Sequence, residues 1–150
     1  NNGYITPVTL PSEKGFRAHK TLNINYMSTH TESYAMLRNN SQRIARIKEM
    51  EGSLSGSVVT YIPKHSLHNH SLLKEYISDG DIIVIMTSIK GLDTSHIGMA
   101  CWRDGKLYML HASSRHKRVL IEPEPLHTYM MKQPKQTGIM VVRGGIMVKG

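Results

Sequence analysis

The stretch SHIGMACWRDGKLYMLHAS, residues 95–113, predicts a β-hairpin. Two runs of β-prone residues flank Asp104 and Gly105, and an Asp-Gly pair in this position favours the positive φ angles of a two-residue type I′ turn. Such a turn sets Arg103 opposite Lys106. The register of the whole hairpin follows from this one pair.

The predicted register brings two histidines together. Gly98 then faces His111, and His96 becomes the diagonal neighbour of His111 on the same face of the ribbon. Histidine titrates near neutral pH, so two imidazoles on rigid strands can supply a general base and a group that orients it. We therefore take His96 and His111 as the candidate catalytic residues.

The same alternation places the only cysteine elsewhere. Cys101 lies an odd number of residues from His96 and points to the opposite face, which makes it a poor candidate nucleophile. A free cysteine is most often a small core residue, so we expect its thiol to pack in the sheet. A three-residue loop or a β-bulge would reverse this parity.

The rest of the chain predicts one α+β domain. Its 150 residues and 39% hydrophobic content suit a single domain with a core, and residues 1–20 predict an extended lead segment. Strands are expected at 58–62, 82–86, 119–121 and 139–143, with the second buried on both faces. Helices are expected from Thr29 through about Leu37, from a Ser41 cap to Gly52 or Gly56, over 72–77, and from Pro125 to about Lys132.

The composition indicates which classes of partner the protein can bind. Nineteen Lys and Arg against eleven Asp and Glu give a formal net charge of +8, which favours anionic partners. The basic residues are scattered without an aromatic platform, so we expect no nucleic-acid partner. No apolar run is long enough for a membrane span, no signal sequence opens the chain, and one cysteine forms no internal disulfide.

A histidine cluster invites a metal interpretation. His65, His68 and His70 lie within six residues and could reach one zinc ion. The sequence identifies neither a fourth ligand nor supporting groups around them. We therefore expect a polar surface loop, and no metal or other cofactor.

Two pairs of carboxylates suggest a second alternative, a glycoside hydrolase acting on a xylan-type polysaccharide. Such an enzyme needs two carboxyl groups about 5–10 Å apart across the sugar. Asp79 and Asp81 form one pair, but we expect Asp81 to fix the start of its strand. Glu122 and Glu124 form the other, and we expect them to flank Pro123 in a turn.

Several blocks of the chain resemble known cysteine peptidases. Residues 80–84, 95–100 and 110–113 are similar to the glycine-aspartate strand, the catalytic-histidine strand and the third-polar-residue strand of the NlpC-like cysteine peptidases, enzymes of bacterial cell-wall metabolism. The match is closer to the N-acetylmuramoyl-L-alanine-amidase-like branch and spans roughly residues 5 to 144. Further blocks carry it, at 25–30, 61–64, 79–83, 89–93 and 136–139.

The resemblance implies a papain-like (NlpC-like) fold, an antiparallel sheet with helices packed against it. It also implies that His96 is the base and that His111 orients it. The family's nucleophile is a cysteine at the start of a helix ahead of the histidine strand, and no cysteine precedes His96 here. We therefore interpret the chain as the C-terminal part of such an enzyme, and we expect the nucleophile in a preceding segment, either of the same chain or of a separate one.

The resulting expectation is a peptidoglycan amide hydrolase of the Cys-His-His type, to which this chain supplies the two histidines. Its substrate is peptidoglycan or a muropeptide, and its expected location is the cell envelope, periplasmic or secreted. Two alternatives stay open. One is a non-catalytic glycan-binding or interaction module, and the other is the polysaccharide hydrolase that uses acidic residues.

Overall fold

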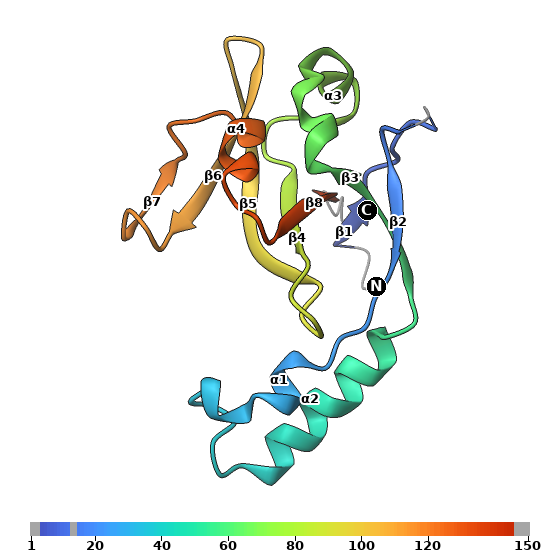
Figure 1. Ribbon diagram of the computed structural model, residues 1–150, viewed down its shortest axis with the longest axis vertical. Coiled ribbons are helices and arrows are strands. Elements are labelled where there is room, and N and C mark those ends of the chain that lie inside the picture. Colours follow the sequence, from blue (N-terminus) through green and yellow to red (C-terminus); the bar gives the residue numbers. More distant parts are fainter. Residues whose placement is uncertain (1–3, 13–14, 146–150) are drawn as a thin grey trace, which may run out of the picture.

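The computed structural model describes residues 4–12 and 15–145, and it confirms an α+β fold. One antiparallel sheet of eight strands runs in the order β2-β3-β8-β4-β5-β6-β7, and β1 pairs with β8 (Figure 1). No helix in the described part is long and apolar enough to cross a membrane. The strands are β1 Ile5–Pro7, β2 Ala18–Thr21, β3 Val58–Pro63, β4 Ile82–Thr87, β5 Thr94–Arg103, β6 Lys106–Ser113, β7 Arg118–Ile121 and β8 Gln136–Gly144. The helices are α1 Tyr26–Thr29, α2 Ser41–Leu54, α3 His70–Tyr76 and α4 Leu126–Met131, with 3-10 turns at Thr31–Ser33 and Lys64–His68.

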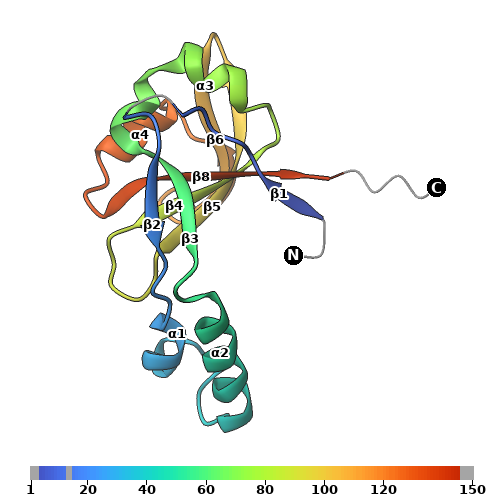
Figure 2. The ribbon, with the colours of Figure 1, turned by 90° about the vertical axis from the view of Figure 1, so that its right-hand side faces the viewer.

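Strand β4 lies at the centre of the sheet. Its apolar run pairs with β5 on one side and with β8 on the other, and Figure 2 shows β8 crossing the body of the molecule beside it. Ile83 and Ile85 are fully buried. A strand with two neighbours has no free edge, and this position suits the β-branched residues that fill it.

The predicted hairpin is confirmed. β5 and β6 pair from Met99 opposite Leu110 to Arg103 opposite Lys106. Asp104 and Gly105 have φ angles of 47° and 72°, as a two-residue turn with two positive φ angles requires. The turn therefore fixes which side chains of the two strands share a face.

One face of the hairpin packs into the core. Short helical elements cover it: Leu67 in a 3-10 turn, Leu73 in α3, and Leu126 and Met130 in α4 lie in one buried cluster with Met109 of β6. These apolar residues exclude water from the part of the hairpin face that lies next to the two histidines. They pack against β6, and Leu107 N of β6 also donates a hydrogen bond to His70 Nδ1 of α3.

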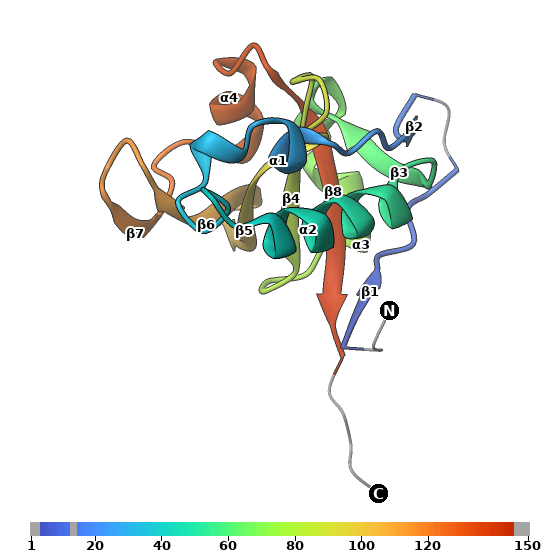
Figure 3. The same ribbon diagram turned by 90° about the horizontal axis from the view of Figure 1, so that it is seen from below.

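Helices α1 and α2 form an arm that projects away from the sheet, and Figure 3 shows them side by side. Glu51 is the only buried residue of α2, and its carboxylate accepts hydrogen bonds from the backbone N–H groups of Met27 and Ser28. Asn25 and Tyr26 donate backbone hydrogen bonds to Gly91 O, which ties the arm to the sheet.

Two helix predictions are wrong. The helix expected from Thr29 through Leu37 is absent, because α1 ends at Thr29 and only a 3-10 turn follows. The Thr29 hydroxyl, expected to open a helix, instead donates to the carbonyl of Asn25, the N-cap of α1. The cap of α2 is Asn40, whose side chain accepts from Arg43 N, so Ser41 is the first helical residue.

The lead segment contributes two strands. β1 pairs with the end of β8, and β2 pairs with β3. Residues 1–3 and 13–14 of the expected segment lie outside the described residues. The chain enters the sheet from its first described residues onward.

Gly138 generates a prediction about packing. A Cβ atom at this position would overlap the carbonyl oxygen of Ile62 and the ring of Tyr61 on β3. Gly138→Ala should destabilise the protein by about 1–3 kcal/mol, because the backbone of β3 cannot move aside as a side chain would. Chemical denaturation measures the change.

Gly52→Ala is the matched control. Gly52 lies in α2 with nothing within 4 Å of an added Cβ, so alanine should stabilise the helix by about 0.5–1 kcal/mol. Equal effects of the two substitutions would contradict the close approach of β8 to β3.

Candidate functional site

Three side chains form a continuous hydrogen-bonded chain at the edge of the core. His96 Nε2 lies 2.8 Å from His111 Nδ1, and His111 Nε2 lies 3.0 Å from a carboxylate oxygen of Glu122. The two imidazole planes are nearly perpendicular, at 88°. The residues come from β5, from β6 and from the position directly after β7, so neighbouring strands position all three.

The positions of the hydrogens in these two hydrogen bonds fix the tautomers of His111 and His96. The Glu122 carboxylate can only accept, so His111 Nε2 carries the hydrogen that joins them. Neutral His111 then has a bare Nδ1, which accepts from His96 Nε2–H. The remaining ring nitrogen of His96, Nδ1, therefore carries a lone pair. His96 is oriented as a base with one defined basic atom.

The three hydrogen-bonded side chains differ in how deeply they are buried. His111 and Glu122 are 5% and 4% exposed, whereas His96 is only half-buried and reaches the solvent side. Burial lowers the pKa of His96 below its ordinary value of 6.5, and the neighbouring His111 lowers it further. His96 is thus neutral at neutral pH, which is the state that a base requires.

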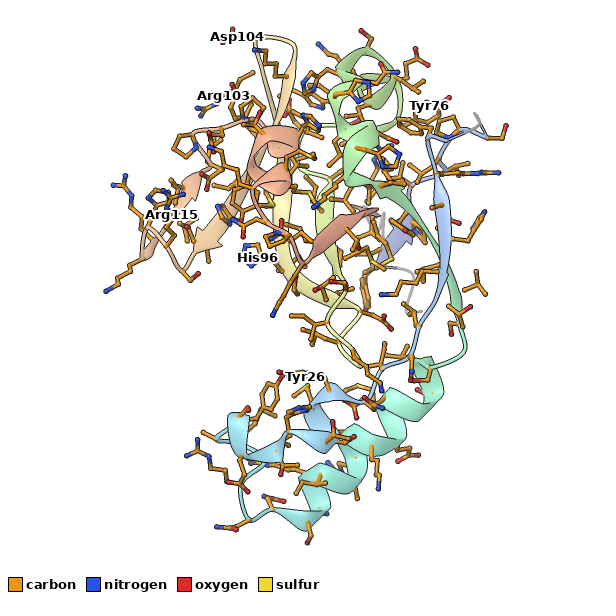
Figure 4. All side chains as sticks on the ribbon, in the orientation of Figure 1. Tyr26, Tyr76, His96, Arg103, Asp104 and Arg115 are labelled. Carbon is orange, nitrogen blue, oxygen red and sulfur yellow. The ribbon has the colours of Figure 1, made fainter. Side chains whose placement is uncertain are left out.

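A cavity of about 400 Å³ opens onto these residues. In Figure 4, His96 lies on β5, with Arg115 on the β6–β7 turn and Tyr26 across from His96 on the arm. Tyr129 of α4 makes an edge contact with the His111 ring. The residues that line the cavity are Ser95, His96, His111, Ser113, Ser114, Arg115, Glu122, Tyr129, Gln133 and Gln136.

Glu122 is the residue that sequence reasoning missed. We expected it to flank Pro123 in a turn, and the structure instead buries it against His111, because Glu122 N donates to Met109 O and extends the β6–β7 ladder by one residue. His116 of the β6–β7 turn also approaches its second carboxylate oxygen, at 4.0 Å. The alternation that paired His96 with His111 would have placed Glu122 diagonal to His111, had the turn between β6 and β7 been predictable.

The other carboxylates have structural partners. Glu124 pairs with Lys132, and Asp79 accepts from the backbone N–H of Trp102. Asp81 accepts from Ser78 N and forms two hydrogen bonds with Arg143, which fixes the start of β4 as expected. Burial, the largest single influence, would raise the pKa of Asp81, but the hydrogen bonds from Arg143 and from Ser78 N and the charge of Arg143 together hold that pKa below its ordinary value.

The histidine cluster is dispersed in the fold. His65 and His68 lie on a 3-10 turn, and His70 is the first residue of α3. His68 faces His127 edge to ring, and His70 faces Trp102. Within residues 4–12 and 15–145, no three His, Cys, Asp or Glu side chains are grouped to hold a metal ion.

Cys101 stands apart from the site. It pairs with Tyr108 in the hairpin and is half-buried. Met99 and Ile97 lie on its face, whereas His96 shares the opposite face with the buried Ala100. The prediction that Cys101 and the histidines lie on opposite faces is confirmed.

The fold is similar to that of solved proteins whose descriptions name an amidase or a xylanase. Solved structures of an N-acetylmuramoyl-L-alanine amidase from Bacteroides uniformis share 39% identity with this chain, with a TM-score of 0.86 over 97% of it. This chain spans 59% of that amidase's length. A "putative xylanase" from Bacteroides fragilis shares 36% identity and a TM-score of 0.82, over 93% of this chain and 58% of its own.

A more distant structure shows the fold alone. A Legionella pneumophila protein has 24% identity and a TM-score of 0.61, over 95% of this chain and 56% of its own. A comparison with curated protein sequences finds no match. The model of the AmiA-like, N-acetylmuramoyl-L-alanine amidase-like family matches residues 6–139, and the chain therefore belongs to that family.

Proposed function

We propose that this chain supplies the base of a cysteine-dependent amide hydrolase that acts on peptidoglycan. The observation that carries the proposal is the buried Glu122–His111–His96 chain, which leaves His96 Nδ1 as a basic atom at an open cavity. A carboxylate that orients an imidazole towards a nucleophile is a recurring device of acyl transfer. The family membership supports an N-acetylmuramoyl-L-alanine amide as the bond that is cut.

The proposed reaction has two steps. The proton of a cysteine thiol moves to His96 Nδ1, and the sulfur forms a bond to the amide carbonyl carbon. The carbon–nitrogen bond then breaks as His96 returns the proton to the departing amine. Water attacks the resulting thioester, with His96 again as base, and releases the acid and the free thiol.

The nucleophile lies outside these 150 residues in this proposal, because Cys101 is their only cysteine and faces away. A preceding segment of the same protein, or a separate chain, would bring it to the cavity. The share of the solved amidase that this chain spans, 59%, leaves room for such a segment. A cell-envelope location, periplasmic or secreted, follows from the proposed substrate.

The polysaccharide alternative has less support. Among the described residues, Glu122 is the only carboxylate that lines the cavity, and it is already hydrogen-bonded to His111. Glycoside hydrolysis needs a second carboxyl group across the sugar, and Glu124 is paired with Lys132 instead. A non-catalytic binding module would not need a buried carboxylate and imidazole, Glu122 and His111, that orient one ring nitrogen of His96.

The first functional prediction compares variants in a protein that includes a cysteine-bearing segment. Residues 1–150 alone should release no product from muropeptides, and adding that segment should restore release. In the longer protein, His96→Ala should abolish turnover because the thiol loses its base. His111→Ala should reduce turnover less, since the base remains but is no longer oriented.

Cys101→Ser is the control for that series, and it should stay within a few fold of the parent rate. Turnover is measured on muropeptides and, for the alternative, on xylan. Loss of activity in a folded Cys101→Ser protein would contradict the opposite-face assignment. Xylan cleavage that survives His96→Ala would refute the amidase proposal.

The second prediction concerns Glu122. Glu122→Gln keeps the size of the side chain but removes its charge, and because the amide can either accept from or donate to His111 Nε2, it no longer fixes the tautomers of His111 and His96. Turnover should fall by about tenfold or more. Glu124→Gln, which removes a carboxylate outside the cavity, should leave turnover unchanged. Equal losses in both variants would show that Glu122 acts only through net charge.

The third prediction is a pH profile. Because burial and His111 lower the pKa of His96, its neutral form persists below the ordinary value of 6.5. The acid limb of kcat/KM should therefore fall at a pH below 6.5. Glu122→Gln should move that limb further down, because the carboxylate no longer stabilises a positive charge on the imidazole pair. An acid limb at the same pH in Glu122→Gln as in the parent protein would show that Glu122 does not affect the pKa of His96.

A further inference from the structure

One face of the sheet is apolar and stays exposed in the described part of the chain. The helical elements pack on the opposite face, which carries the buried core, and Figure 1 shows α4 in front of β5 and β6. On the exposed face, the register aligns apolar side chains across β8, β4, β5, β6 and β7. We call this surface the open face and define it by Val84, Ile97, Met99, Leu110, Val119 and Met140.

The open face has the composition of a buried surface. An antiparallel sheet with one face in water normally alternates apolar with polar residues, but β5 places Ile97, Met99 and Cys101 on this side. Ile97 and Met99 are 60% and 44% exposed, and Val119 of β7 is 69% exposed. The apolar run of β4 predicts burial on both faces, yet Val84 is only half-buried. Monomeric proteins rarely expose a contiguous apolar surface across several strands, so we expect a partner to cover it.

The first strand of the chain lies beside the open face. β1 pairs with the end of β8, and Pro7 lies opposite Val142, which shares a face with Met140. Ile5 is on the same side of β1 and is 44% exposed. A hollow of about 380 Å³ lies next to these strands, and its lining includes Pro7, Val58 and Met140. A chain that leads into β1 would therefore meet the open face and an apolar hollow at once.

We propose that the open face docks the part of the longer protein that lies outside these 150 residues. About two fifths of the solved amidase's length has no counterpart in this chain, which is enough to form a second layer on the sheet. The occupant is thus an apolar surface of that part, and the hollow beside β1 receives one of its large side chains. The proposal rests on the proposed function, because it takes the same part to bring the cysteine.

Docking and catalysis occupy opposite sides of β5. His96 lines the cavity, whereas its neighbour Ile97 lies on the open face. The stretch that covers the open face therefore does not touch His96, and the cysteine comes from another stretch of the same part. The role of the open face is to anchor that part on strands that also carry the base.

The test measures alkylation of two introduced cysteines in the longer protein. Ile97→Cys lies on the open face, and Met131→Cys on α4 is the matched control, because Met131 is 51% exposed and α4 packs on the core face. Mass spectrometry of the peptides follows each cysteine separately from Cys101 and the nucleophile. Ile97→Cys should react about 100-fold more slowly than Met131→Cys, since the docked layer has to open first. Equal rates would overturn the proposal.

Thermal unfolding of the longer protein gives a second measurement. Ile97→Thr keeps the branch at Cβ but puts a hydroxyl under the docked layer, so the midpoint should fall by about 5 °C. Met131→Gln should change it by less than about 1 °C, because that side chain stays in water. A midpoint that Ile97→Thr leaves unchanged would show that the open face is in water and would also overturn the proposal.

A second copy of the chain is the competing occupant. Protection of Ile97→Cys that disappears on dilution, in a protein that sediments as a dimer, would assign the open face to self-association and overturn the proposal. Protection in a protein that sediments as a monomer at every concentration supports it.

These outcomes are separable from the proposed function, which is tested by turnover. If the longer protein cleaves no muropeptide while Ile97→Cys is protected, the hydrolase proposal fails and the docking assignment holds. If it cleaves muropeptides while Ile97→Cys reacts as fast as Met131→Cys, the hydrolase holds and the docking assignment fails.

Discussion

Strand register is the constraint on which the site depends. The two-residue turn at Asp104 and Gly105 sets the pairing of β5 with β6, and the alternation of side chains then places His96 and His111 on one face. The same alternation turns Cys101 away. A shift of one residue would move His96 to the solvent face and leave Glu122 buried without an imidazole. The register thus determines both the position of the base, His96, and the partner of the buried Glu122 carboxylate.

The burial of Glu122 is stable only because His111 accompanies it. An unpaired carboxylate in an apolar environment is strongly unfavourable, whereas one that accepts an imidazole N–H recovers much of the lost hydration. His111 is in turn held by Met109 and Leu110 in the strand and by Tyr129 from α4. Packing therefore determines an electronic property, which is the ring nitrogen of His96 that carries the lone pair.

Local sequence signals predicted much of this arrangement, and the exceptions have physical causes. The Asp-Gly turn, the apolar run of β4 and the helix ending near Leu54 were all visible in the sequence, because each depends on neighbours within a few residues. Glu122 was missed because the turn at 114–117 has no glycine or proline, and Lys117 adopts a positive φ of 53° without a local signal. The register of β7 was therefore not predictable.

The helix expected after Thr29 does not form, and the reason is the opposite one. Its capping pattern was present, but tertiary contacts overrode it: Glu51 of α2 caps the preceding turn, and Gly91 holds the backbone of Asn25 and Tyr26. Such features emerge only when distant strands are brought together.

The order of the strands has a consequence for folding. The three residues of the relay, His96, His111 and Glu122, lie within one β5–β6–β7 meander whose contacts are all between consecutive strands. The pairing of β4 with β8, by contrast, closes a loop of about fifty residues, which is slower because more chain entropy is lost. The meander can therefore set the geometry of the relay before β8 completes the sheet. Gln136 is the first residue of β8, so the cavity wall that it contributes is complete only when β8 has joined the sheet.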